Sequence, residues 1–371
     1  MQRKSKNESI ILRDELGETF EKLASQAIAE QNSTEQMISK ETMQAIHKVL
    51  MNNESYHNAI KTKVAHPDEI VRLIESILIL YKHDLDSLAN IDCLCREPFY
   101  SLNISGALLA FKTTGLEITR ERRDAVVENA EYAFALTDPL HVMAENDKYD
   151  TAGQPILTKE NEKAIYQHAK LAEDIGSALS YLGTTESLII TQPMFNAVIA
   201  MAKAGLLSRA NSPIQYDKPI NPYEHILKNL ELIAADPRNA ENMASALIRL
   251  HQYRLLDSRY YPVNAREFIL AVAAVDPGQV KAAAKLIIKL RQAMILDQDN
   301  LDKLLKHPDK IVIILKNFHP REKDKKDDQF MLDSIIDTLD KKEMKQMFWD
   351  QTGIRASGST GPGAEHKPKL K

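Results

Sequence analysis

The chain has 371 residues, of which 44% are hydrophobic and 27% charged, and its formal net charge is −4. This composition is typical of a water-soluble globular protein with a real core. The near-neutral charge excludes a general attraction to nucleic acid or anionic lipid, although it leaves room for a local basic patch. Glycine is scarce and strong helix formers dominate, so we expect helices.

Residues 1–35 are predicted to form an amphipathic N-terminal helix, with Ile10, Leu16 and Phe20 on its apolar side. The basic start is followed by no apolar segment of the kind found in secretory signal peptides. The longest strongly apolar run, residues 77–81, is far too short to span a bilayer. We therefore expect a soluble protein that is cytoplasmic in the cell that makes it.

Residues 36–207 contain a recurring pattern in which a large aliphatic residue precedes Ser, Thr or Asp and a helical stretch follows. A side-chain oxygen at this position can accept hydrogen bonds from the free N–H groups of the first helical turn. The aliphatic residue before it can pack back onto the helix. The predicted helix caps, which are structural residues, are Ser39, Thr119, Thr158, Thr191, Asp257 and Asp297.

Proline junctions separate the repeats, as at Asp236-Pro237, Asp276-Pro277 and His307-Pro308. Proline is tolerated in a first helical turn but breaks a helix interior, so each junction marks an end and a restart. The unit is a helix, a short turn, a capped helix and a proline junction, with a period of roughly 30 to 40 residues. We predict an all-α fold of degenerate two-helix repeats, stacked as an α-solenoid-like or layered helical array.

The rest of the chain divides by composition. Residues 208–222 are predicted to be a loop insertion, residues 223–318 the second half of the repeats, and residues 319–329 a charged linker. Residues 330–350 are expected to form a helix that caps the array, and residues 351–371 a disordered tail.

Candidates for chemistry are few, and we assign no catalytic, cofactor-binding or metal-binding residue. Cys93 and Cys95 lack the further ligands that a zinc site needs, so they are interpreted as thiols near an apolar helix end. The sequence His-Pro-Asp at 307–309, the signature of J-domain co-chaperones, also occurs at 66–68, where the repeat requires a junction. The cluster around Arg122 is interpreted as a solvated helix face rather than a phosphate site.

The repeat resembles a helical repeat of effectors from Legionella and Coxiella. The resemblance is carried by residues 157–168 and by the Leu-Leu-Asp and Ile-Leu-Asp turns with Asn300, and it extends over about residues 36–318. The sequence departs from that pattern at Arg122 and Met194, where Asn is replaced. The resemblance implies a substrate of the Dot/Icm type IV secretion system, delivered into a host cytosol.

Repeat architecture without recognisable chemistry favours a protein-binding scaffold whose partner is a protein. The resemblance implies that this partner belongs to a host. The alternative is an effector enzyme with a pocket built from the irregular segments 80–155 or 208–222. A membrane contact through the first or last amphipathic helix is a third, weaker hypothesis, and no nucleic acid or cofactor is expected.

Overall fold

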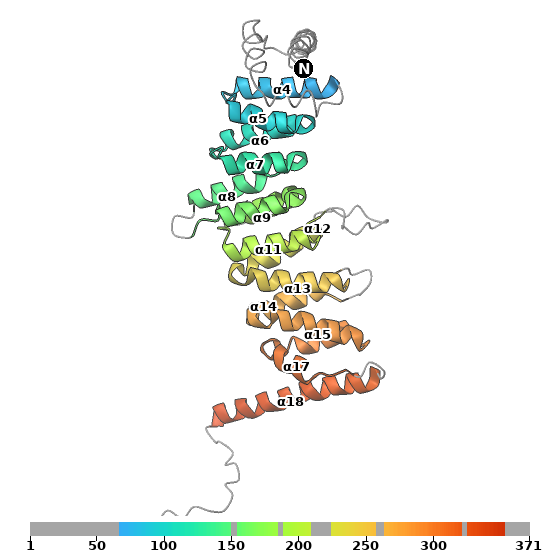
Figure 1. Cartoon of the computed structure of the whole chain (residues 1–371). Helices are drawn as coiled ribbons and strands as arrows, with labels where there is room; N and C mark the ends of the chain where they lie inside the picture. The colour runs from blue at the N-terminus through green and yellow to red at the C-terminus, as the bar shows by residue number, and fades with distance from the viewer. Residues whose placement is uncertain are drawn as a thin grey trace, which may run out of the picture. The chain divides into compact units, whose positions relative to one another are not determined.

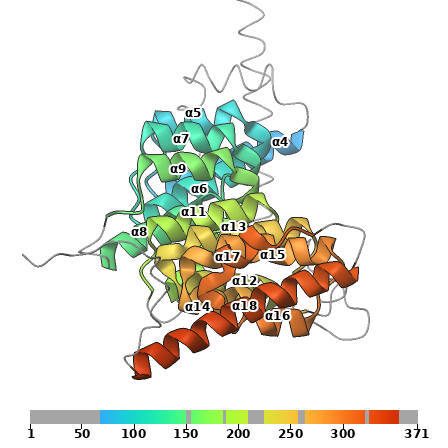
Figure 2. The same cartoon turned by 90° about the horizontal axis from the view of Figure 1, so that it is seen from below.

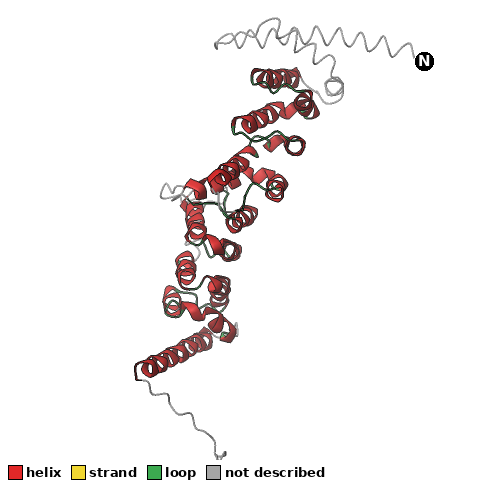
Figure 3. Ribbon diagram, turned by 90° about the vertical axis from the view of Figure 1, so that its left-hand side faces the viewer, coloured by secondary structure: helices red, strands yellow, loops and turns green. Residues whose placement is uncertain are grey.

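The computed structural model describes residues 67–149, 154–184, 188–208, 224–256, 263–320 and 325–352. All regular structure in these ranges is helical, and Figure 3 shows no strand among them. The predicted all-α class is therefore confirmed. No helix in the described ranges is long and apolar enough to cross a membrane. The predicted N-terminal helix and the tail from residue 353 onward lie outside the described residues.

The chain divides into two compact units, residues 1–240 and residues 241–371. The predicted insertion 208–222 lies outside the described residues from residue 209 onward. The boundary between the units falls at the start of a helix, after Ala240, and each unit is described below by itself.

Unit 1 is a succession of helices joined by short 3₁₀ turns and tight loops (Figure 1). Its elements are α4 (Pro67–Lys82), α5 (Leu88–Arg96), η1 (Pro98–Tyr100), α6 (Ser101–Thr113), α7 (Arg120–Glu128), η2 (Ala130–Tyr132), α8 (Thr137–Tyr149), α9 (Lys159–Gln167), η3 (Ala169–Leu171), α10 (Ala172–Thr184), α11 (Gln192–Lys203), α12 (Glu224–Ala235) and η5 (Pro237–Asn239).

Unit 2 repeats the same alternation (Figure 2). Its elements are α13 (Ala240–Gln252), α14 (Ala265–Val275), η6 (Pro277–Gln279), α15 (Val280–Gln292), α16 (Gln298–Leu304), η7 (Pro308–Lys310), α17 (Ile311–Asn317) and α18 (Lys325–Thr352).

Within unit 1 the helices form two layers. Helices α4, α6, α8, α10 and α12 pack one after another, and helices α5, α7, α9 and α11 lie beside them. The aliphatic side chains between the layers are fully buried, among them Leu73, Ile104, Leu179 and Val198. A single helix pair could not bury both of its apolar stripes, so the core continues from each repeat into the next.

The turn that ends the longer helices is the same in both units. At Gly115 after α6 and at Met294 after α15 the backbone is left-handed, with φ near 74° and 57°. The next residue, Leu116 or Ile295, donates its N–H to a carbonyl five residues earlier, at 2.8 and 3.0 Å. This is the Schellman helix end, in which an aliphatic residue after the left-handed one packs against the helix.

The proline junctions of unit 2 are short 3₁₀ helices that begin at Pro277 and Pro308. A fixed φ suits proline to a first turn, and its missing N–H costs nothing there. At the second junction, His307 is 1% exposed. Its ring nitrogens face Asp340 at 2.8 Å and Glu343 at 3.2 Å, both on α18. A junction residue therefore holds the last helix against the repeats.

Two boundaries differ from the sequence-based expectation. The segment 80–155, expected to be irregular, is largely helical because α5, α6, α7 and α8 follow one another with only short turns between them. The last helix begins at Lys325, so it includes the end of the predicted linker 319–329. The two acidic residues there, Asp327 and Asp328, suit a first helical turn because they face the positive end of the helix dipole.

Candidate functional site

The predicted caps position the start of each short helix. Thr119 is the N-cap of α7, and its hydroxyl accepts a hydrogen bond from the backbone N–H of Arg122 at 3.2 Å. Thr158 caps α9 in the same way through Asn161, also at 3.2 Å. Asp297 caps α16 through the N–H of Asn300 at 2.8 Å.

The other predicted caps have different outcomes. Ser39 and Asp257 lie outside the described residues. Thr191 stands at the N-cap of α11 with extended backbone, but its side chain makes no capping hydrogen bond. Its hydroxyl oxygen is buried without a hydrogen-bond partner among the described residues. Ser87, which the sequence analysis did not single out, caps α5 through the N–H of Asn90.

The residue three positions after each cap makes a second bond that closes the turn. The side-chain amide of Asn161 donates to the carbonyl of Ile156 at 2.8 Å, and that of Asn300 donates to Ile295 at 2.7 Å. Arg122 stands at the corresponding place in α7 and donates to the carbonyl of Glu117 at 2.7 Å. Arginine therefore replaces asparagine here without losing the bond to the incoming chain.

The same residues also join neighbouring repeats. Asn161 and Gln192 exchange two amide hydrogen bonds of 2.9 and 3.0 Å, which connect α9 to α11. In unit 2, Asn300 and Gln329 exchange two bonds of 2.9 Å, which connect α16 to α18. This pairing fixes the register of adjacent helices through Asn161 and Asn300, whose buried amides need hydrogen-bond partners.

Between α7 and α9 an ion pair takes the place of the amide pair. The guanidinium of Arg122 donates to both carboxylate oxygens of Glu162, at 2.7 and 3.3 Å. Tyr166 donates its hydroxyl to the same carboxylate at 2.8 Å. Burial alone would lower the pKa of Arg122, but the hydrogen bond and charge of Glu162 outweigh it and raise that pKa. The interpretation of Arg122 as part of a solvated helix face is wrong, because this residue is only 8% exposed.

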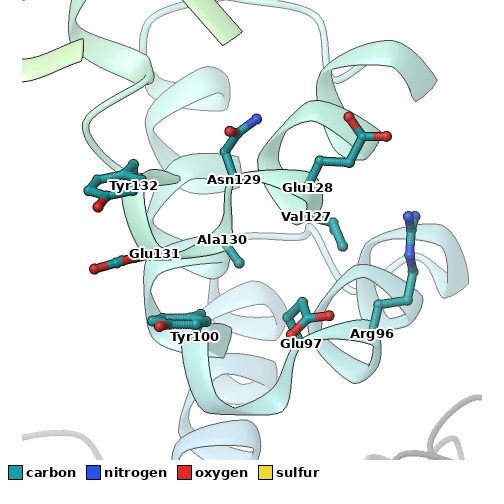
Figure 4. A pocket seen from close by; sticks show the side chains of 9 residues that line it. All are labelled: Arg96, Glu97, Tyr100, Val127, Glu128, Asn129, Ala130, Glu131 and Tyr132. Carbon is teal, nitrogen blue, oxygen red and sulfur yellow. The ribbon is translucent and has the colours of Figure 1, made fainter. Parts of the chain in front are cut away.

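An open groove of about 470 Å³ lies where the ends of α5 and α7 meet their 3₁₀ turns (Figure 4). Tyr100, Glu131 and Tyr132 lie on one side of it, and Arg96 and Glu128 on the other. The amide of Asn103 on α6 donates to the carbonyl of Glu131 at 2.9 Å, which fixes the η2 wall. The groove therefore has a defined shape that depends on the packing of two successive repeats.

The electrostatics of this groove are acidic. Three carboxylates, those of Glu97, Glu128 and Glu131, and one guanidinium, that of Arg96, line it. The guanidinium is bonded to Asp124 at 2.8 Å, and this hydrogen bond raises the pKa of Arg96 and lowers that of Asp124. The cation is therefore engaged by a carboxylate outside the groove, and the lining keeps an excess of negative charge.

Aromatic side chains border the same edge. Tyr100 and Phe99 meet edge to face with ring centroids 4.8 Å apart, and the ring of Phe99 is half exposed. The guanidinium of Arg72 sits 5.0 Å from the centroid of Phe99. The charge of Glu131 raises the pKa of Tyr132. Aromatic rings beside carboxylates are a suitable environment for cationic side chains.

The chain matches no protein-family model, no curated protein and no solved structure. The function is therefore argued from the groove and the repeats alone.

The remaining candidates do not form a reactive site. Cys93 and Cys95 are both buried in α5, where burial raises their pKa values to about 11 and about 12. Thiols with such pKa values are not nucleophiles at neutral pH. In the described residues no group of three or more His, Cys, Asp or Glu side chains is arranged to hold a metal ion.

Proposed function

We propose that this chain is a protein-binding helical repeat scaffold, and that the groove between α5–η1 and α7–η2 binds a basic segment of its partner. The observation that carries the proposal is that Glu97, Glu128 and Glu131 line one concave surface together with two tyrosines. Stacked repeats commonly present such surfaces for protein recognition.

Charge selects the class of partner. Lysine and arginine side chains complement the excess of carboxylates, and opposite charge speeds association and excludes acidic partners. Tyr100 and Tyr132 offer flat apolar area with few rotatable bonds, which is why tyrosine is common in binding sites. The contact between Arg72 and Phe99 shows a cation already held on an aromatic ring at this edge of the molecule.

The rival function, an enzyme, would use the same groove, which lies within the segment 80–155. An enzyme would need two of the three lining carboxylates to act as a general acid and a general base. Such chemistry depends on the exclusion of bulk water from the substrate, whereas Glu128 and Glu131 are exposed in an open groove. This geometry favours binding over catalysis.

The place of action rests on the repeat pattern alone. We propose delivery into a host cytosol through a type IV secretion system, as the resemblance of residues 157–168 to Legionella and Coxiella effectors implies. A fusion of the chain to an adenylate cyclase reporter tests this. Cyclic AMP should rise in host cells infected with secretion-competent Legionella and stay at background with a Dot/Icm-deficient strain. Equal signals from the two strains would reject the secretion proposal and leave the groove proposal standing.

The binding proposal is tested by selection from a library of random peptides displayed on phage. The full chain is expected to enrich peptides with several Lys or Arg residues and at least one aromatic residue. A variant with Glu97, Glu128 and Glu131 all changed to Gln should lose this enrichment. Selection of the same basic peptides by the variant would show that the groove is not the binding surface.

A further inference from the structure

A second groove, of about 510 Å³, lies in unit 2 between the C-terminal halves of α13 and α15 and the side of α17. Its lining has the opposite charge to the groove in unit 1. Three cationic side chains, those of Arg249, Lys285 and Lys289, line it, and no Asp or Glu is among its lining residues. The chain as a whole is slightly acidic, so this concentration of positive charge is local.

Two of these cations are available to a ligand. Arg249 and Lys285 are exposed, and neither has an ion-pair partner within 4.0 Å in the part of unit 2 that the structure describes. Helix geometry places Lys285 and Lys289 on one face of α15, because residues four apart lie one above the other. Arg249 faces them from the last turn of α13.

The third cation is fixed in place. The ammonium of Lys289 donates to the carbonyls of Leu315, in the last turn of α17, at 3.3 Å and of Phe318, directly after that helix, at 2.8 Å. An ammonium has three N–H donors, so one remains for a ligand. Lys289 therefore holds the α17 wall of the groove and still contributes its charge to the interior.

Neutral groups complete the lining. The amides of Gln252 and Gln292 are exposed at its edge, and the rest of the lining is one exposed aromatic side chain, that of Tyr253, and the apolar side chains of Ile288 and Leu315. Arg291 donates to the carbonyl of Tyr253, which ties the turn after α13 to the end of α15. The equivalent turn of unit 1 has the same bond, from Lys112 to the carbonyl of His83. The groove is thus built on a contact that holds successive repeats together.

We propose that this groove is a second docking site, which binds an acidic segment of a partner protein. Carboxylates on the segment would pair with Arg249 and Lys285, amide side chains would bond its backbone, and an aliphatic side chain would pack on Leu315. Charge complementarity favours this occupant, and the mixture of amide and apolar groups suits a peptide. Binding of single-stranded nucleic acid commonly uses several aromatic side chains on which the bases stack. A membrane surface suits a protruding apolar helix face and not a concave groove.

The test is a fluorescence-anisotropy titration of the full chain with a labelled 12-residue peptide made of Glu-Glu-Leu triplets, at physiological salt. We expect saturable binding, and no binding of the Gln-Gln-Leu counterpart. Changing both Arg249 and Lys285 to Gln should weaken binding by about tenfold or more, since two charge contacts are lost. The charge-matched control changes Lys281 and Lys316 to Gln, both exposed and outside the groove lining, and should stay within about twofold of the unmodified chain.

Three results would overturn the proposal. The first is no saturable binding of the Glu-Glu-Leu peptide at millimolar concentration. The second is an equal loss of affinity in the groove and control variants, which would indicate charge without a site. The third is tighter binding to a 20-nucleotide single-stranded DNA or to phosphatidylserine vesicles, lost in the groove variant. Because the groove of unit 1 is unchanged in both variants, these results are distinguishable from a failure of the basic-segment proposal.

Discussion

Replacement of Glu162 by Gln tests the buried ion pair that joins α7 to α9. The substitution keeps the shape of the side chain but removes its charge. The guanidinium of Arg122 then loses its counter-ion and keeps two neutral acceptors, the carbonyl of Glu117 and the new amide oxygen. Tyr166 also loses a charged acceptor. The change therefore isolates the electrostatic contribution of one contact between repeats.

The magnitude follows from burial. The side chains of Arg122 and Glu162 are 10% and 14% exposed, so solvent screens the pair only in part. Breaking a fully buried pair costs about 3–5 kcal/mol, and we take about 2–3 kcal/mol for this slightly exposed one. For a unit of this size, that loss corresponds to a fall in melting temperature of roughly 5–10 °C.

The assay is thermal unfolding followed by circular dichroism, with hydrogen exchange of α7 and α9 to locate the loss. The control is Glu160→Gln, an exposed carboxylate in the first turn of the same helix, which should cost no more than about 0.5 kcal/mol. Replacement of both Arg122 and Glu162 by apolar residues should recover most of the stability, since no charge is then left unpaired. A Glu162→Gln protein that melts within 1 °C of the control would refute the reasoning.

Three further predictions concern the turns that end the helices, the amide hydrogen bonds between repeats, and the two thiols. Gly115→Ala should destabilise unit 1 by about 1 kcal/mol in urea unfolding, because a Cβ strains the left-handed turn. Met294→Gly should be neutral or slightly stabilising, because glycine adopts the left-handed conformation without strain. The opposite order of stabilities would contradict the assignment of the two turns. Asn300→Ala should lower the free energy of unfolding by about 2 kcal/mol and speed hydrogen exchange at the start of α18, since it removes the bond to Ile295 and both bonds to Gln329. Unchanged exchange there would show that these bonds do not hold α18 in place. Cys93 and Cys95 should resist iodoacetamide at pH 8 until the chain unfolds. Their raised pKa values mean that the folded state loses stability above about pH 9, where unfolded thiols ionise; rapid alkylation of the folded chain would show that they are not buried.

Much of the helical framework could be predicted from local signals. A cap such as Thr158 is recognisable because an aliphatic residue precedes it and a helical stretch follows, and both effects act within a few residues. The junction at Pro308 is recognisable for the same reason, since proline restricts the chain directly around itself.

The links between repeats were not predictable in the same way. The amide of Asn161 meets Gln192, 31 residues later, and Arg122 meets Glu162, 40 residues later. A sequence shows that Arg122 occupies the asparagine position, but not which side chain of the next helix will face it. Arg122 therefore looked like part of a solvated face, and its burial became visible only when α7 and α9 were side by side.

The groove of unit 1 is hidden for a related reason. Its residues come from two helix ends about 30 residues apart, and only one of the two junctions carries a proline, Pro98, while Ala130 stands at the other. Isolated carboxylates such as Glu131 look like any solvated helix surface in a sequence. Their presence in one groove depends on the distance between successive repeats, which the contacts between the repeats set.

The most direct test of the proposed binding role is the affinity of one enriched basic peptide for three forms of the full chain. These are the unmodified protein, the groove variant with Glu97, Glu128 and Glu131 changed to Gln, and a charge-matched control with three exposed carboxylates of unit 1 outside the groove changed to Gln. The control positions are Glu117, Glu121 and Glu160.

We predict that the groove variant binds the peptide at least about tenfold more weakly, while the control stays within about twofold of the unmodified protein. Equal affinities for the groove variant and the unmodified protein, or an equal loss in both variants, would contradict the assignment of this groove as the binding surface.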